Sequence, residues 1–157
     1  MEYRLRPTTI AFLLVLLVMV GCHRAADGVG EQVPRRPEFF GLPVTGDSVA
    51  YVVNCPGFLS PDEIGRLRSG VIESIRSLPR TTEFCVFLYS EGPYLTAPGS
   101  SLVPATPENK ETAAETISAM PFRGGNDPGV PFVEALALEP EEMFFLSEGQ
   151  FDKALAR

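Results

Sequence analysis

The chain has little of what catalysis most often requires. Its single histidine is His23, which lies outside the part of the chain that is expected to fold. Nucleophilic catalysis by a Ser-His-Asp or Cys-His arrangement therefore lacks a base. The sequence also has no G-x-S-x-G motif, no G-x-x-x-x-G-K-[ST] motif and no C-x-x-C pair. We therefore expect that this protein is not an enzyme.

Positive charge is scarce as well. The chain has 13 Lys and Arg against 20 Asp and Glu, which gives a formal net charge of −7. An acidic chain repels phosphate backbones, and the pair Arg35-Arg36 is too short to form a basic patch. We therefore exclude nucleic acid as a partner. With 157 residues, 45% of them hydrophobic, the chain is long enough for one domain with a buried core.

The longest apolar run is residues 8–21, TTIAFLLVLLVMVG. It is shorter than the roughly 20 apolar residues that a membrane-spanning helix needs. It follows Arg4 and Arg6, and a short apolar run after positive charges is typical of a signal-peptide core. The run leads into M-V-G-C, which resembles the lipobox of bacterial lipoproteins, apart from Met19 where those proteins usually have leucine.

The lipobox resemblance implies that residues 1–21 are a signal peptide and that Cys22 is lipidated and becomes the mature N-terminus. The protein would then be anchored to a membrane of the cell envelope and face outside the cytoplasm. A plain signal peptide, or an uncleaved hydrophobic anchor with an incidental cysteine, is the alternative. Residues 22–37 follow, and their Gly, Pro, Ala and charged residues are typical of a flexible tether.

Apolar runs and helix signals alternate along the rest of the chain. The first helix has the clearest start, with Ser60 as N-cap, Pro61 in the first turn and Glu63 completing a capping box. Phe39-Phe40 predicts either a short edge strand or a plug at the base of the domain. Buried strands are predicted at 48–53, 83–90 and 142–149, and helices at 60–78, at 106–120 and from Asn126 or Asp127 to 138. This alternation predicts a parallel sheet with helices on its faces.

The remaining cysteines are Cys55 and Cys85. Cys55 follows the predicted strand 48–53, and Cys85 lies near the start of the predicted strand 83–90. If these strands are parallel neighbours, the two residues are offset by roughly 16 Å along the sheet. A disulfide needs Cα atoms within about 7 Å of each other. We therefore expect two free, mostly buried thiols.

Several segments together resemble a von Willebrand factor A (vWA) domain. They are SVAYVV-N-C-P-G-F-L, EFCVFLYSEG, LVPATPEN and MPFRGGNDP, followed by MFFLSEGQFD, and the resemblance runs from about Glu38 to Asp152. It implies a Rossmann-like, three-layer α/β fold with a mostly parallel central sheet and helices on both faces. Residues 38–157 would then be a partial vWA-like domain that lacks the family's last strands. In that case the strand at 142–149 would be an exposed sheet edge.

The vWA family binds a cation at the metal-ion-dependent adhesion site (MIDAS), at the carboxyl ends of its strands. None of the five matching positions in this chain carries the family residue. The first aspartate is replaced by Asn54, the two serines by Pro56 and Phe58, the loop threonine by Asn126 and the late aspartate by Glu148. A hard cation needs several oxygen ligands with charge among them. We therefore expect a degenerate site without a metal, in which Phe58 covers the cleft.

These observations favour a non-catalytic, membrane-tethered domain for protein–protein interaction or scaffolding, with a protein partner that the sequence does not identify. One alternative is a metal-dependent adhesion module that binds Mg²⁺ or Ca²⁺ weakly through Asn126, Asp127 and Glu148. Asn54 would then join these residues in holding the cation through water. Another is a truncated remnant without independent function. A hydrolase or redox enzyme built on Cys55 is the most distant alternative, because a buried thiol is a poor nucleophile.

Overall fold

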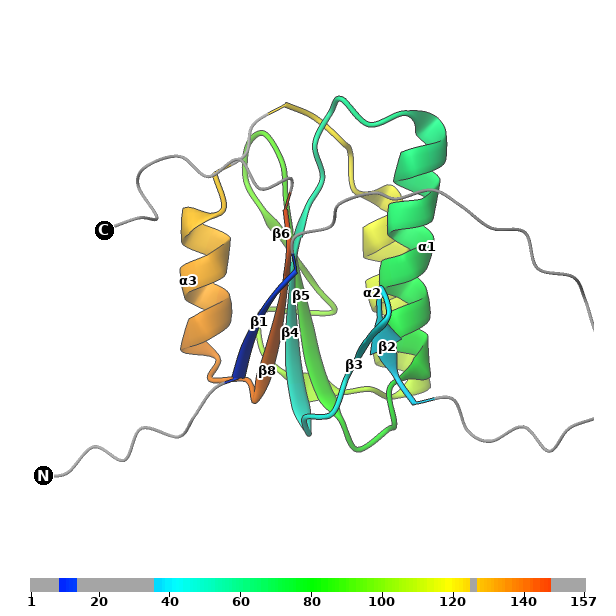
Figure 1. The fold of residues 1–157 in the computed structure, drawn as a ribbon, viewed down its shortest axis with the longest axis vertical. Helices are drawn as coiled ribbons and strands as arrows, with labels where there is room; N and C mark the ends of the chain where they lie inside the picture. Colours follow the sequence, from blue (N-terminus) through cyan, green and yellow to red (C-terminus); the bar gives the residue numbers. More distant parts are fainter. Residues whose placement is uncertain (1–8, 14–35, 125–126, 148–157) are drawn as a thin grey trace, which may run out of the picture.

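The computed structural model describes residues 9–13, by their backbone only, together with residues 36–124 and 127–147. Two short strands, β2 and β3, form a hairpin, and the other strands form one sheet (Figure 1). The elements in chain order are β1 (Thr9–Leu13), β2 (Glu38–Phe39), β3 (Leu42–Pro43), β4 (Ser48–Asn54), α1 (Pro61–Ser77), β5 (Glu83–Tyr89), β6 (Leu95–Ala97), β7 (Val103–Pro104), α2 (Pro107–Ala119), α3 (Gly129–Ala137) and β8 (Glu142–Leu146).

The sheet has the strand order β1-β8-β4-β5-β6. The short strand β7 also pairs with β5, at Glu83 and Phe84. β1, β8, β4 and β5 run parallel, whereas β6 and β7 run antiparallel to β5. Helices α1 and α2 cover one face of the sheet and α3 covers the other (Figure 1). The predicted fold class, α/β with a mostly parallel sheet between helices, is therefore confirmed.

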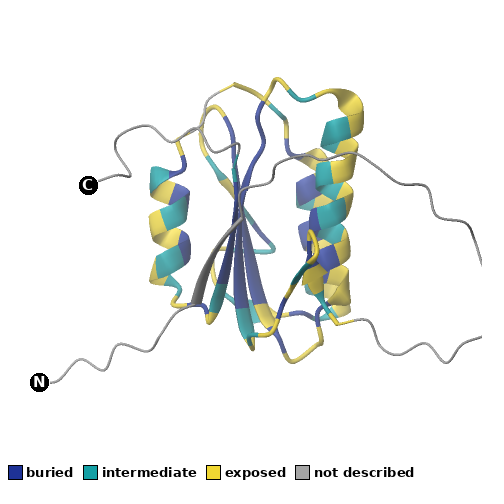
Figure 2. Cartoon of the chain, viewed as in Figure 1, coloured by how far each residue is buried: buried dark blue, intermediate teal, exposed yellow. Residues whose placement is uncertain are grey.

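Strand β4 shows why the sheet must be covered on both faces. All of its residues after Ser48 are buried, and Figure 2 shows the strand in the colour of buried residues. Val49, Tyr51 and Val53 pack into the core on the side of α1 and α2. Ala50 and Val52 pack into the core beneath α3. The continuous apolar run that predicted a doubly buried strand is thereby explained by two separate cores.

Helix α1 begins as the sequence predicts. The Ser60 side chain accepts a hydrogen bond from the Glu63 amide, and the Glu63 carboxylate accepts one from the Ser60 amide at 2.8 Å. This reciprocal pair satisfies two of the free amides at the start of the helix. The buried side of α1 includes Val71 and Ile75 and faces α2 and the sheet.

The hairpin of β2 and β3 resolves the two alternatives for residues 39 and 40. Phe39 is buried and its ring contacts Tyr51 and Phe144, with centroids 5.0 and 5.1 Å away. Phe40 is the first residue of the two-residue turn and stays 42% exposed. Phe39 is thus a plug in the core under α1, and the hairpin is separate from the central sheet.

The prediction of an exposed edge at residues 142–149 is wrong for this structure. β1 pairs with β8 in parallel, from Thr9 beside Glu142 to Leu13 beside Leu146. The sequence does not predict this pairing, because residues 8–21 match the pattern of a signal peptide. Cys22 and most of the predicted tether at 22–37 lie outside the described residues. Among the helices that the structure describes, none has the length and apolar character needed to cross a bilayer.

Candidate functional site: an apolar pocket at the carboxyl ends of the strands

The residues predicted to replace metal ligands follow directly from β4. Asn54 is the last residue of the strand and is 3% exposed, Pro56 is also buried, and Phe58 is 68% exposed. They present one amide and two side chains without oxygen, which does not fit the ligand set of a hard cation. Asn126 and Glu148 lie outside the described residues. Within residues 36–124 and 127–147, no three His, Cys, Asp or Glu side chains gather as a metal site requires.

A buried hydroxyl holds the loop after β4 against a segment far along the chain. The Ser90 Oγ accepts a hydrogen bond from the Arg123 amide at 2.9 Å. The same hydroxyl lies 2.9 Å from the carbonyl oxygen of Cys55 and 3.0 Å from that of Arg123, and it can donate its one proton to either. Pro56 and Arg123 form an isolated parallel bridge beside it. Three chain segments therefore meet at this end of the sheet.

Gly57 is required by this close approach. A Cβ at position 57 would lie 2.7 Å from the carbonyl carbon of Arg123 and 2.9 Å from the amide nitrogen of Gly124. Both contacts are with backbone atoms, so the loops would have to separate to admit a methyl group. Gly57 is therefore needed for the close contact between these two backbone segments.

Asn54, Pro56 and Phe58 line a common pocket of about 380 Å³. It opens between the loop after β4, the first turns of α1 and the β2–β3 hairpin. Its walls are predominantly apolar, and Glu63 and Arg66 are the charged residues among them. The remaining lining residues are Phe40, Leu59, Leu67, Leu146 and Ser147. Phe58 is the most exposed of the large apolar side chains that line this pocket.

Phe40 forms one wall of the pocket from an unfavourable backbone conformation. It has φ of 48° and Gly41 has φ of 84°, as a two-residue hairpin turn of type I′ requires. Bulky residues rarely adopt this left-handed conformation. The ring of Phe40 lies over Gly70 of α1, where a Cβ would be 2.6 Å from Cζ of the ring. Its ring also packs edge-on against Phe39, with centroids 4.9 Å apart.

The pocket carries one charge that no described residue pairs. The Glu63 carboxylate accepts hydrogen bonds from the amide and the side chain of Ser60. The hydrogen bond from the side chain is the main reason that the pKa of Glu63 lies below its usual value. Arg66 also lowers this pKa by its charge. Within the described parts of the chain, Arg66 itself forms no ion pair; the pair that does form joins Arg76 and Glu111.

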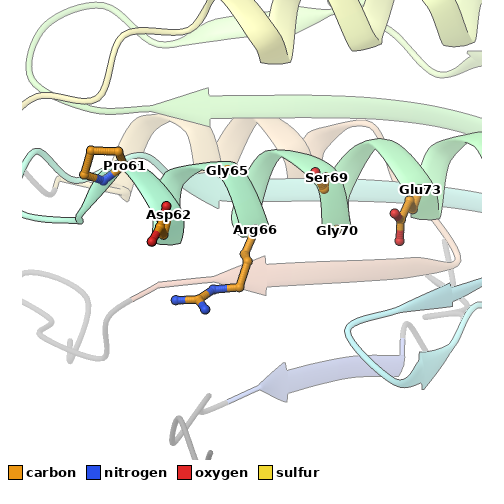
Figure 3. A pocket seen from close by; sticks show the side chains of 7 residues that line it. All are labelled: Pro61, Asp62, Gly65, Arg66, Ser69, Gly70 and Glu73. Carbon is orange, nitrogen blue, oxygen red and sulfur yellow. The ribbon is translucent and has the colours of Figure 1, made fainter. Parts of the chain in front are cut away.

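A second hollow lies along the outer side of α1 (Figure 3). It is larger, at about 630 Å³, but it is an open surface depression. Asp62, Arg66 and Glu73 project from the same side of the helix, and all three are exposed. Their side chains lie in water, where single charged contacts contribute little. The smaller apolar pocket is therefore the better candidate site.

The two thiols are free and buried, as predicted. The register pairs Ala50 of β4 with Cys85 of β5, which confirms the five-residue offset from Cys55. Burial raises the pKa of Cys55 from 9.0 to about 12, against a smaller lowering effect of Arg68. Burial likewise raises the pKa of Cys85 to about 12. Neither thiol is activated as a nucleophile.

Sequence reasoning missed two contributors to the site. The sequence places Phe40 only in a strand or a plug, although Gly41 after it marks a turn. It places Ser90 only at the end of a strand, whereas the hydrogen bonds of Ser90 reach residues 33 and 35 positions away. No local pattern reports a contact at that separation. Phe58, in contrast, is predicted by the resemblance.

No protein-family model matches the chain, and no curated protein matches it. Among solved structures, it is similar to a von Willebrand factor type A protein from Catenulispora acidiphila, with a TM-score of 0.49 and 17% sequence identity. The similarity covers 60% of this chain and 22% of that one. This chain thus corresponds to less than a quarter of that protein's length. At this identity and TM-score the similarity does not establish membership of a family.

We predict that Gly57→Ala lowers the free energy of unfolding by about 1–3 kcal/mol, the usual effect of forcing a group into a packed site. Gly65→Ala is the matched control, because a Cβ at that helical position meets nothing within 4 Å. It should stabilise the protein by about 0.5–1 kcal/mol through helix propensity. Urea unfolding followed by circular dichroism measures both; equal effects of the two changes would contradict the contact at Gly57.

We predict that iodoacetamide leaves Cys55 and Cys85 unmodified in the native protein near neutral pH, and modifies both after denaturation. Mass spectrometry of the peptides reads the result, and rapid native labelling of Cys55 would contradict it.

The raised pKa values of the two thiols also limit the stability of the fold at alkaline pH. Between pH 9 and about 12 the folded state keeps protons that unfolded thiols lose. The free energy of unfolding should therefore fall as the pH rises through this range.

Proposed function

We propose that this chain is a non-catalytic, membrane-tethered domain of vWA type that binds a protein partner through the apolar pocket, without a metal. One observation carries the proposal: Asn54, Pro56 and Phe58, the positions that match metal ligands in the sequence resemblance, line a single apolar pocket. Their place at the carboxyl ends of parallel strands is where α/β proteins commonly bind ligands. The ligand site is thus retained with different chemistry.

The chemistry of the pocket defines the partner surface that fits it. An apolar side chain of the partner fits between Phe40, Phe58 and Leu67, because burying such a group is favourable at about 25 cal/mol per Å². A carboxylate beside that side chain would meet Arg66, which pairs with no described residue. We therefore infer a partner segment with a leucine, methionine or phenylalanine next to an acidic residue. The tether rests on the lipobox-like sequence at Cys22.

Photo-crosslinking in cells tests the contact. With p-benzoylphenylalanine at Phe58 we expect a covalent adduct with one partner protein in the envelope fraction. The matched control carries the same group at Val133, which is 60% exposed on α3, across the sheet from the pocket. Replacing residues 1–22 by a cleavable signal sequence without a lipobox should move the adduct out of the membrane fraction. Failure to form an adduct at Phe58, or the same adduct from Val133, would argue against the pocket as the contact site.

The charge at the rim gives the same experiment a second control. Arg66→Glu should reduce the yield of the Phe58 adduct, because it replaces attraction to a carboxylate by repulsion. Arg80→Glu changes the net charge equally at an exposed position beyond the end of α1. It should leave the yield unchanged. If both variants act alike, only the overall charge matters and the assigned role of Arg66 is wrong.

Metal titration separates this proposal from a metal-dependent adhesion module. Isothermal titration with Mg²⁺, Mn²⁺ and Ca²⁺ should give no saturable binding in the micromolar range, since the described positions supply too few oxygen ligands. Glu148→Ala should then change nothing, as should the control Glu115→Ala at an exposed site on α2. Micromolar binding that Glu148→Ala alone abolishes would establish the adhesion module in place of the metal-free pocket.

A further inference from the structure

The outer edge of β8 is occupied by a segment of the same chain. Five residues of β1 pair in parallel with five of β8, from Thr9 beside Glu142 to Leu13 beside Leu146. The β1 sequence is Thr-Ile-Ala-Phe-Leu, so all but its first residue are apolar. The structure therefore displays what this edge accepts: a short, extended, apolar segment that runs in the direction of β8.

The same five residues have a second role in the proposed function. They lie within residues 8–21, the predicted core of the signal peptide, and processing before Cys22 would remove them. A segment that has been cleaved off cannot pair with β8. This step of the argument rests on the proposed export and processing of the chain. The processed protein would present β8 as an open edge.

The chemistry of β8 makes such an edge a strong acceptor. Met143 and Phe145 are buried in the core beneath α3, while Phe144 and Leu146 are buried in the opposite core. This burial is measured with β1 in place. Removing β1 leaves a row of unpaired backbone N–H and C=O groups between two apolar surfaces. An added strand would satisfy the backbone groups and cover both surfaces at once.

We propose that the β8 edge of the processed chain is a strand-acceptor site, to which a partner protein donates an extended apolar segment parallel to β8. The backbone ladder supplies affinity, and the alternation of apolar side chains between the two faces supplies selectivity. This site runs along the edge of β8 and adjoins the pocket near Phe58, with which it shares Leu146. It adds a second contact by which one partner could be held.

A peptide-binding experiment tests the acceptor site. The full-length gene is expressed in a bacterium, the envelope form is isolated in detergent, and mass spectrometry reads whether residues 1–21 have been removed. The probe is a fluorescent peptide of residues 8–14 flanked by lysines for solubility. The processed chain should bind it saturably. A peptide with proline in place of both Ala11 and Phe12 should bind about tenfold weaker, because proline removes ladder hydrogen bonds.

The unprocessed chain supplies the matched control. Cys22→Ser protein that retains residues 1–21 should bind the probe with an affinity at least about tenfold lower, because its own β1 occupies the edge. Equal binding by processed and unprocessed chains, or equal binding of the two peptides, overturns the acceptor site. A processed chain that ignores the peptide but still crosslinks through Phe58 overturns this inference alone. An envelope protein that retains residues 1–21 overturns the processing on which both tethering and acceptor site depend.

Discussion

The structure depends on the burial of one strand, β4, from every direction. β5 and β8 pair with its two edges, and helices cover its two faces, so its backbone and side chains are both removed from water. A parallel strand buried in this way requires crossover helices, because parallel neighbours cannot be joined by a tight turn. The loops that follow parallel strands then emerge at one end of the sheet. The position of the pocket is a consequence of that geometry.

At this end of the sheet the backbone is held together by close polar contacts, whereas the side chains at the surface are mostly apolar. Ser90 and Gly57 hold three segments in close contact, which is the framework that a ligand site needs. The side chains placed on this framework are apolar, and Phe58 and Phe40 dominate the surface. Cation binding depends on charge and on ligand geometry, whereas apolar recognition depends on the area that is buried. The pocket described here therefore has the character of an apolar surface and not that of a cation site.

Much of the fold could be predicted because the signals are local. Strands β4, β5 and β8 are continuous apolar runs, and the capping box of Ser60 and Glu63 marks the start of α1. β1 could not be predicted, since its apolar residues are equally suited to a signal peptide. The pocket was only half predictable: Phe58 follows from the motif, but Phe40 reaches the pocket through a turn conformation that sequence patterns disfavour. Contacts such as Ser90 with Arg123 depend on the assembled sheet and leave no trace in the sequence.

The turn at Phe40 places stability and recognition in opposition. Asparagine or glycine would tolerate its left-handed backbone better, and relief of such strain is typically favourable by about 1 kcal/mol. The same replacement would remove an aromatic wall of the pocket. A library sorted only for thermal resistance would thus enrich molecules that fold well and no longer offer this surface. For this protein, the melting temperature is therefore a poor guide to which variants keep the aromatic wall of the pocket.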